Sequence, residues 1–422
     1  MTNRFKTVFV LVLAGMMMVA GQAAARQKTA SARQKPAAVK QPPKQVLATQ
    51  IGSNDSIIIR RVKDGAVLFS ENSDKPLVPA SILKIVTSLA ALHYLGEEYR
   101  FPTEGYQRPD GTLVIKGYGD PSLVSEDLEL MARTVASLAG KTTALAVDYS
   151  YFTACDLPGR CCNSLEPYDA PIGALSVNYN TVSYKKQKNG TYVSGEPQTP
   201  LVPFALERIR SLPFSQGRVM VINCEKEAAI YCGELFACFL GRNGCPVRGP
   251  ISEYRVDPKK DRLVYQHPSR KNLRQIVAQL LHYSSNFTAN QLLFACGVKK
   301  YGPPATLDKG LRALQSYLQE ELNIKNIQLT EGSGLSPENR VSAATMCRLL
   351  DAFAPYKELM KKDADEYYKT GTLTNVSTRA GYITADSGRR FQYVIMFNSP
   401  GKKAKRLMPV VKAFIKEADH RL

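Results

Sequence analysis

The sequence predicts an α/β protein in which an antiparallel sheet packs against helices and a long insertion interrupts the fold. The sheet is predicted from short strand patterns near both ends of the chain, at 56–70 and 380–398. The helices are predicted from apolar residues that recur at helical spacing within 272–360. The insertion is predicted at 99–266, where strand-like pieces alternate with Gly, Pro and Cys. A chain of 422 residues has room for such a division into domains.

The N-terminus has the pattern of a secretory signal peptide over residues 1–25. Arg4 and Lys6 make its start positive, the apolar run 8–20 follows, and small residues precede a cleavage point near Ala25. The run is too short for a comfortable transmembrane helix, so an uncleaved anchor is the weaker alternative. We therefore expect an exported protein that is periplasmic or associated with the cell wall.

A basic linker is predicted at 26–46, which is rich in Ala, Gln and Pro. The whole chain carries a formal net charge of +19, with a pI near 9.5. This charge suits peripheral contact with an anionic wall or membrane surface, although a solvated basic surface is the plainer interpretation. Nucleic acid is not an expected partner, because the chain has an export signal and no recognised nucleic-acid-binding motif.

The ordered part is predicted to begin with a hairpin and a core helix. Strands at 56–61 and 66–70 flank a Lys-Asp-Gly turn at 63–65. A helix is predicted from Ser81 to Leu95, and Gly96 closes it. Its apolar residues surround most of its circumference, so we expect this helix in the middle of a core.

The insertion is predicted to be rich in β-strands, with short strands at 113–116, 144–148 and 218–223. Helices and then strands follow it, and a last helix closes the chain. The predicted elements after the insertion are helices at 272–283, 287–297, 306–322 and 342–360, strands at 380–385 and 391–398, and a helix at 402–420.

The chain has nine cysteines, of which seven lie between Cys155 and Cys245. In an exported protein they are interpreted first as disulfide partners, and at least one thiol stays outside such pairs because the count is odd. A zinc site is the weaker alternative, since no paired Cys-x-x-Cys spacing occurs. We expect no metal and no cofactor.

Ser81 and Lys84 form a Ser-x-x-Lys pair at the start of the predicted core helix, one turn apart on the same face. A Ser hydroxyl becomes a good nucleophile only when a base removes its proton. A Lys that is half-buried among apolar residues can lose its own proton and serve as that base. The spacing recurs at 183–186 and 399–402, but neither of those pairs opens a buried helix. A Ser helix cap beside an exposed Lys is the structural alternative.

Two further motifs carry groups that suit a peptide substrate. Ser-Ser-Asn at 284–286 falls between two helical patterns, where a hydroxyl and an amide can relay protons and hold a substrate amide. Lys-Thr-Gly-Thr at 369–372 offers a cation, hydroxyls and a glycine, which suit a substrate that ends in a carboxylate. Each motif is weak alone and could be an ordinary turn, and Ser-x-Asn also occurs at 70–72 and 176–178.

The three motifs occur in the order Ser-x-x-Lys, Ser-x-Asn, Lys-Thr-Gly, which is typical of penicilloyl-serine transferases. The chain resembles the low-molecular-mass class C penicillin-binding proteins, the D-alanyl-D-alanine carboxypeptidase/endopeptidase family. This family also carries a large insertion between its first and second motifs. The matching stretches are PASILK (79–84), GYGDPSL (117–123), APIGALSVNYNTV (170–182), YCGELF (231–236), SSNFTANQLL (284–293), EGSGLSPENRVS (331–342) and KTGTLTNVSTRAGYI (369–383).

The resemblance implies which residues carry out the chemistry. Ser81 would be the acylated nucleophile and Lys84 its base. Ser284 and Asn286 would assist proton transfer and bind the substrate amide. The reaction would be acyl transfer through a serine ester.

The resemblance also implies how the substrate is held. Lys369, Thr370 and Thr372 would bind the terminal carboxylate, with Gly371 letting it lie against the backbone. The backbone N–H groups of Ser81 and Thr372 would form the oxyanion hole. The implied partners are peptidoglycan stem peptides that end in D-Ala-D-Ala or carry D-configured cross-links, with β-lactam antibiotics as covalent inhibitors.

The fold implied by the resemblance is β-lactamase/transpeptidase-like, with helices on both faces of the sheet and a helical subdomain. The catalytic domain would comprise 47–98 and 267–422, and 99–266 would form the inserted domain or domains. Two features depart from the family pattern: Ser285 stands where Asp is more familiar, and the interval 346–369 is short and lacks a glycine-containing stretch.

Two other functions compete with this prediction. A β-lactamase-like hydrolase would need an added base for rapid deacylation, and the motifs contain none. An inactive wall-binding or scaffold protein of the same fold would be expected to have lost part of the site, whereas Ser81, Lys84, Asn286 and Lys369 are all present.

Overall fold

The computed structural model describes residues 41–138, 144–153, 156–161 and 164–421. The predicted signal peptide and most of the predicted linker lie outside these residues. Pro42–Leu422 forms one compact unit. In this described part of the chain, no helix is both long enough and apolar enough to cross a membrane.

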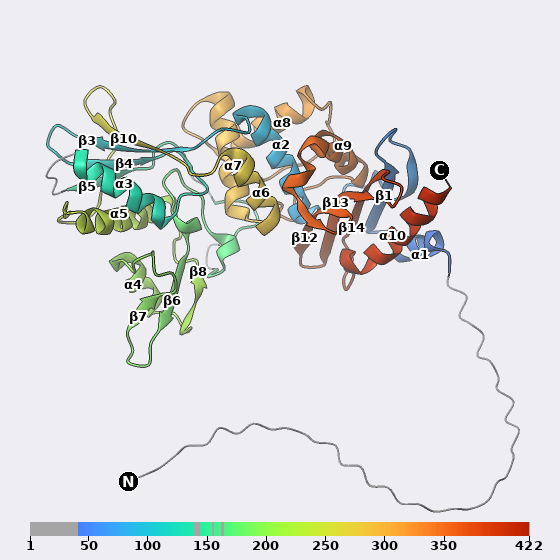
Figure 1. Ribbon diagram of the computed structural model, residues 1–422, viewed down its shortest axis with the longest axis horizontal. Coiled ribbons are helices and arrows are strands. Elements are labelled where there is room, and N and C mark those ends of the chain that lie inside the picture. Colours follow the sequence, from blue (N-terminus) through green and yellow to red (C-terminus); the bar gives the residue numbers. More distant parts are fainter. Residues whose placement is uncertain (1–40, 139–143, 154–155, 162–163, 422) are drawn as a thin grey trace, which may run out of the picture. The chain divides into compact units, whose positions relative to one another are not determined.

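A six-stranded antiparallel sheet carries the C-terminal part of the fold (Figure 1). In order across the sheet, its strands are β11 (Lys361–Asp363), β12 (Glu366–Leu373), β13 (Val376–Thr384), β14 (Arg390–Phe397), β1 (Asp55–Arg61) and β2 (Val67–Glu71). The pairing of β1 with β14 places Ile57 opposite Ile395. The predicted sheet of the first hairpin and the last strands is therefore confirmed.

Both faces of the inner strands β13, β14 and β1 are buried, as their side chains, which point alternately to the two sides of the sheet, are nearly all covered. Ile57 and Ile59 face α1 (Pro43–Gln50) and α10 (Ala404–His420), whereas Ile58 belongs to the main helical core. This double burial explains the unbroken apolar run of β1.

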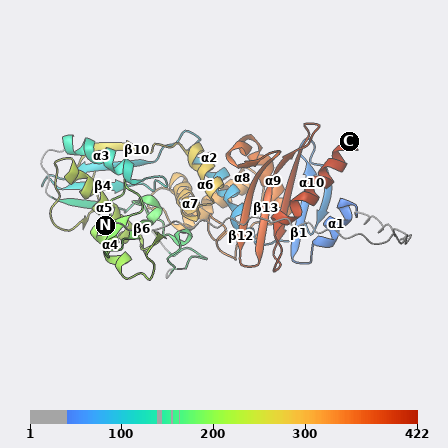
Figure 2. The same ribbon diagram turned by 60° about the horizontal axis from the view of Figure 1, so that its bottom comes forward.

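Five helices build the core on the other face, opposite α1 and α10 (Figures 1 and 2). They are α2 (Lys84–Leu95), α6 (Leu273–Tyr283), α7 (Asn286–Tyr301), α8 (Leu307–Glu320) and α9 (Ala343–Phe353). Every residue of α2 from Lys84 to Leu92 is buried, as the sequence predicts. Asn272 and Gln275 form a capping box at α6, which fixes where that helix begins.

The insertion contains helices as well as strands, so the prediction of a β-rich segment is wrong in part. α3 (Ser125–Leu138) and α5 (Glu225–Arg242) pack together, and the apolar residues of α3 recur at helical spacing. One sheet of the insertion has the order β10 (Arg262–Pro268), β3 (Pro102–Gln107), β4 (Leu113–Gly117), β5 (Leu145–Asp148) and β9 (Ser252–Glu253). A second sheet has the order β7 (Tyr192–Ser194), β6 (Val182–Lys186) and β8 (Gln216–Val219). The insertion also contains the helix α4 (Pro203–Arg210).

Two further expectations differ from the structure. The predicted linker runs to residue 46, but α1 already begins at Pro43 and buries Leu47. The expected disulfides are not seen at Cys161, Cys224, Cys232, Cys296 or Cys347, and the last three of these are buried thiols that pack as small apolar groups. Cys155 and Cys162 lie outside the described residues.

Candidate active site

Ser81 lies in a 3₁₀ turn, Ala80–Leu83, that leads directly into α2. The predicted helix therefore starts with a tighter turn than expected. Two glycines let other segments approach this turn closely: a Cβ on Gly334 would lie 2.0 Å from the Ala80 carbonyl oxygen, and a Cβ on Gly371 would lie 2.7 Å from the Ser81 nitrogen. The serine is thus fixed between the 331–336 loop and β12.

Lys84 is completely buried and its side chain points back to the serine. Its Nζ donates hydrogen bonds to Ser81 Oγ (2.9 Å), Asn286 Oδ1 (2.8 Å) and the Ser333 carbonyl oxygen (2.7 Å). Burial lowers the pKa of Lys84 to about 7, against a smaller raising effect from the charge of Glu331. A substantial share of the Lys84 amines is therefore neutral near pH 7 and able to accept the hydroxyl proton.

The 284–286 motif forms the junction between α6 and α7. Ser284 has a left-handed backbone (φ 64°) that ends α6, and the Ser285 side chain accepts a hydrogen bond from the Thr288 N–H and caps α7. Ser is as good a helix cap as Asp, so the departure at Ser285 preserves the local structure. This junction directs Ser284 and Asn286 towards the two buried lysines.

Lys369 is the second buried lysine, and it lies inside β12. Its Nζ donates to Ser284 Oγ (2.8 Å) and to the Thr370 carbonyl oxygen (2.6 Å). Burial lowers the pKa of Lys369, and the neighbouring charges of Lys84 and Lys361 lower it further. Thr370 and Thr372 are exposed on the same strand, where a bound molecule can reach their hydroxyls.

The structure thus brings the three sequence motifs together into one array. Ser81 contacts Lys84, Lys84 contacts Asn286, and Ser284 contacts Lys369. β12 lies in close contact with the Ser81 turn at Gly371, which is next to Thr372, one of the two residues of the predicted oxyanion hole. The catalytic roles of these residues stay predictions.

Three residues take part in the site in ways that were not predicted from the sequence: Ser333, Tyr168 and Glu331. The Ser333 carbonyl and the Tyr168 carbonyl both bind the array, since Asn286 Nδ2 donates to the Tyr168 oxygen (3.1 Å). Glu331 lies behind Ser333 and is fully buried. Backbone carbonyls leave no residue-type signal, and only the mixture of glycine and serine around Glu331 in EGSGLS hinted at a tightly folded loop.

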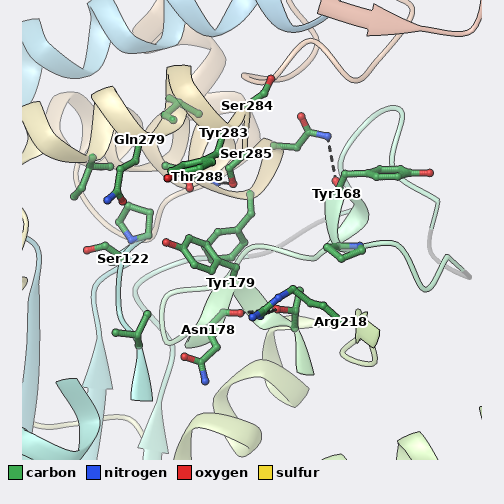
Figure 3. Close-up of a pocket in the computed structure, with 18 of the residues that line it drawn as sticks. Ser122, Tyr168, Asn178, Tyr179, Arg218, Gln279, Tyr283, Ser284, Ser285 and Thr288 are labelled. Carbon is green, nitrogen blue, oxygen red and sulfur yellow. Dashed lines mark hydrogen bonds between the residues drawn. The ribbon is translucent and has the colours of Figure 1, made fainter. Parts of the chain in front are cut away.

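A cavity of about 740 Å³ opens beside the 284–286 junction (Figure 3). Tyr283, Ser284 and Ser285 lie along one side of it, and Tyr179 and Arg218 of the insertion lie opposite. Arg218 is paired with Glu196 and donates to Thr181 Oγ1 (2.9 Å), so its charge is partly satisfied. The cavity is therefore a mixed aromatic and polar space that adjoins the array on the side of the insertion.

No group of three or more His, Cys, Asp or Glu side chains in the described part of the chain could hold a metal ion. The array itself offers a hydroxyl, a partly neutral amine and a buried cation. Together these groups can perform acyl transfer by a serine nucleophile.

Comparison with known proteins places the chain in a family. Residues 44–367 match the model of the D-Ala-D-Ala carboxypeptidase 3 (S13) family. The chain is 26% identical over 412 residues to a D-alanyl-D-alanine carboxypeptidase of Actinomadura sp. (strain R39), covering 80% of this chain and 76% of that one. It is 23% identical over 415 residues to D-alanyl-D-alanine carboxypeptidase DacB of Haemophilus influenzae, covering 82% of this chain and 86% of that one.

The fold agrees with this comparison. The crystal structure of penicillin binding protein 4 (dacB) from Haemophilus influenzae superposes with a TM-score of 0.72 at 20% identity, over 89% of this chain and 98% of that chain. The predicted fold class is confirmed. The chain belongs to the D-Ala-D-Ala carboxypeptidase 3 (S13) family.

Proposed function

We propose that Ser81 is the nucleophile through which this serine DD-peptidase cleaves peptidoglycan stem peptides at a D-alanyl bond. The observation that carries the proposal is the contact of Ser81 Oγ with the buried Lys84 amine, 2.9 Å apart. Because burial holds the pKa of Lys84 at about 7, the amine can take the hydroxyl proton without another base.

In the proposed reaction, Ser81 Oγ attacks the carbonyl carbon of the D-alanyl bond as its proton moves to Lys84. Backbone N–H groups of Ser81 and Thr372 stabilise the resulting oxyanion. The proton passes to the leaving amine, with Ser284 as a relay, and the C–N bond breaks. Water then hydrolyses the serine ester and regenerates the hydroxyl.

The substrate is held at two ends of the site. We assign the terminal carboxylate to Lys369, Thr370 and Thr372, since a buried cation and two exposed hydroxyls lie together on β12. Asn286 binds the preceding amide. The cavity adjoins Asn286 rather than the 369–372 strand, so it receives the part of the peptide that precedes the cleaved bond.

β-Lactams present a strained amide and a carboxylate to the same groups, and we propose that they acylate Ser81. A solved structure of the Haemophilus influenzae protein is described as complexed with a β-lactam. We further propose that the acyl-enzyme is hydrolysed slowly, because Lys84 is the one base that contacts Ser81 Oγ within the described part of the chain. The signal-like sequence at 1–25 supports export to the periplasm or cell wall.

A fluorescent penicillin followed by a denaturing gel tests the nucleophile. Wild-type protein should give a labelled band, and Ser81→Ala should give none while keeping its fold by circular dichroism. A folded wild type that takes no label would refute the proposal, and rapid turnover of a chromogenic cephalosporin would indicate a β-lactamase instead. Mass spectrometry of digested cross-linked peptidoglycan then separates carboxypeptidase activity, which releases D-Ala, from endopeptidase activity, which cuts the cross-link.

A further inference from the structure

Glu331 is a completely buried carboxylate that lies one loop away from Lys84. Its oxygens accept hydrogen bonds from six groups, and no ion pair in the described part of the chain involves it. The donors are the N–H groups of Ser333 (2.7 Å), Gly334 (2.6 Å) and Ser336 (3.4 Å), the Ser333 hydroxyl (2.6 Å), and the side-chain amides of Asn290 (3.1 Å) and Asn339 (2.9 Å). A buried carboxylate that meets so many donors and no contacting cation needs a functional explanation.

These hydrogen bonds fold the 331–336 loop around the carboxylate and fix the backbone at Ser333. The loop is also attached to both neighbouring helices, because Thr87 Oγ1 donates to the Gly332 carbonyl (2.6 Å) and the Gly332 N–H donates to Asn290 Oδ1 (2.7 Å). The Ser333 carbonyl, which accepts from Lys84 Nζ at 2.7 Å, is therefore held at a set position. Glu331 determines where Lys84 finds its third partner.

The charge of Glu331 also acts on Lys84. Burial is the larger influence and lowers the pKa of Lys84, whereas the Glu331 charge raises it. Lys369 on β12 is the neighbouring lysine, and its own pKa is lowered by burial and further by the charge of Lys84. Of these buried charged groups, Glu331 is the one whose charge favours protonation of Lys84.

We propose that Glu331 is a positioning residue for the acylation of Ser81, acting through the Ser333 carbonyl and through its negative charge on the ammonium that Lys84 becomes. This inference rests on the proposed role of Lys84 as base. When the Ser81 hydroxyl proton moves to Lys84, the new positive charge forms in a buried site where water cannot stabilise it. The proton then goes on from Lys84 to the leaving amine, and Lys84 returns to its neutral form.

The test measures the rate of acylation by a fluorescent penicillin across the pH range around neutrality. In the wild type, the rate should fall on the acid side as Lys84 becomes protonated. Glu331→Gln keeps the size of the side chain but removes the charge, so this acid limb should move down by about one pH unit and the plateau rate should fall by about tenfold. Loss of a purely structural contact would lower the plateau without moving the limb.

Two further variants complete the test. Asn339→Ala removes one buried donor to Glu331 and leaves the charge, so its acid limb should stay at the wild-type position. Glu331→Asp shortens the side chain by one methylene group and so moves the carboxylate away from Lys84. Its acid limb should move in the same direction as that of Glu331→Gln, but by a smaller amount. This variant tests the inference if Glu331→Gln fails to fold. An unmoved limb in folded Glu331 variants would overturn the inference, whereas a wild type without any label would refute the proposed function instead.

Discussion

Two lysines, Lys84 and Lys369, are buried within one small site, although a buried ammonium is among the more costly groups that a protein can hold. Asn286 contacts Lys84 and Ser284 contacts Lys369, so both lysines lie beside the α6–α7 junction. Burial lowers the pKa of Lys369 and the charge of Lys84 lowers it further, so the two lysines are more readily charged singly than together. This suits a site in which one lysine gives up its proton and the other attracts a carboxylate.

Replacement of Lys84 should slow acylation strongly, since no other base among the described residues contacts Ser81 Oγ. Lys84→Ala should lower the rate of labelling by fluorescent penicillin by at least about a hundredfold. Lys84→Arg should be no better, because a guanidinium does not deprotonate in proteins. Lys186→Ala is the matched control: this lysine closes another Ser-x-x-Lys pair on the exposed end of β6, and its loss should leave labelling intact. Labelling of folded Lys84→Ala at the wild-type rate would contradict the role of base.

The stability of the fold should depend on the pH because of Lys84. Its folded pKa of about 7 lies below the ordinary 10.5, so the unfolded chain binds the extra proton throughout this window. The free energy of unfolding should therefore rise as the pH rises from about 7 to about 10.5, by an amount on the order of 5 kcal/mol for a complete shift. The lowered pKa of Lys369 should likewise make the free energy of unfolding rise with the pH.

Urea unfolding at both ends of this pH window, for wild type and Lys84→Met, checks the prediction. The variant should show a smaller gain in unfolding free energy than the wild type, because its side chain does not titrate. An equal gain in both proteins would mean that Lys84 has an ordinary pKa in the fold.

β12 can lie against the Ser81 turn only because Gly371 has no side chain at the point of contact. A Cβ on Gly371 would lie 2.4 Å from Thr378 Oγ1 and 2.7 Å from the Ser81 nitrogen. Thr378 is itself held by its hydrogen bond to the Pro79 carbonyl (2.7 Å), so it cannot yield easily. The strand and the turn are therefore fitted to one another at this glycine.

Gly371→Ala should separate β12 from Ser81 and lower the acylation rate by about a hundredfold, as displacements of about 1 Å do in other active sites. Gly241→Ala in α5 is the control, since a Cβ there would contact nothing within 4 Å. Labelling rates by fluorescent penicillin compare the two variants. A wild-type rate in Gly371→Ala would show that the strand can move away without effect on the site.

At the scale of the whole molecule, the site is built from both the sheet-and-helix body and the insertion. The Tyr168 carbonyl binds Asn286, and Gln291 of α7 donates to the Gly173 carbonyl (2.9 Å). Tyr179 reaches the cavity from a turn whose backbone is left-handed at three consecutive residues, 178–180. Such strained backbone persists only where its surroundings hold it, which marks this wall of the cavity as well determined.

Tyr283 offers a test of the cavity as a binding site for the peptide, because its side chain is 75% exposed at the rim and its loss should not disturb the core. Tyr283→Ala should lower kcat/KM for a stem pentapeptide by about tenfold through lost aromatic contact, and should leave acylation by a small penicillin unchanged. Phe214→Ala, which removes an exposed aromatic ring on the insertion, should change neither. Equal kcat/KM for Tyr283→Ala and wild type would show that the peptide does not use this cavity.

The parts that could be predicted from the sequence are those with a local signal. Periodicity and caps located α2, α6 and α7, and motif order identified Ser81, Lys84, Ser284, Asn286 and Lys369 as one set. The helices of the insertion were missed because strand-like pieces and cysteines surround them. Glu331, Ser333 and Tyr168 were missed because their part in the site depends on contacts between distant segments, and two of them act through backbone carbonyls.

The pairing of β1 with β14 has a consequence for how the protein is made. Asp55 lies opposite Phe397 in that ladder, so an inner pair of the sheet joins strands that are more than three hundred residues apart in the sequence. Such distant pairing is slow to form, and here it must wait until synthesis has passed residue 397. During that interval β1 presents an unbroken run of isoleucines to the surroundings, so the unfinished chain should be prone to aggregate unless a chaperone covers this strand. Penicillin binding should therefore arise only after release of the nearly complete chain, and a chain that stops before β14 should show none.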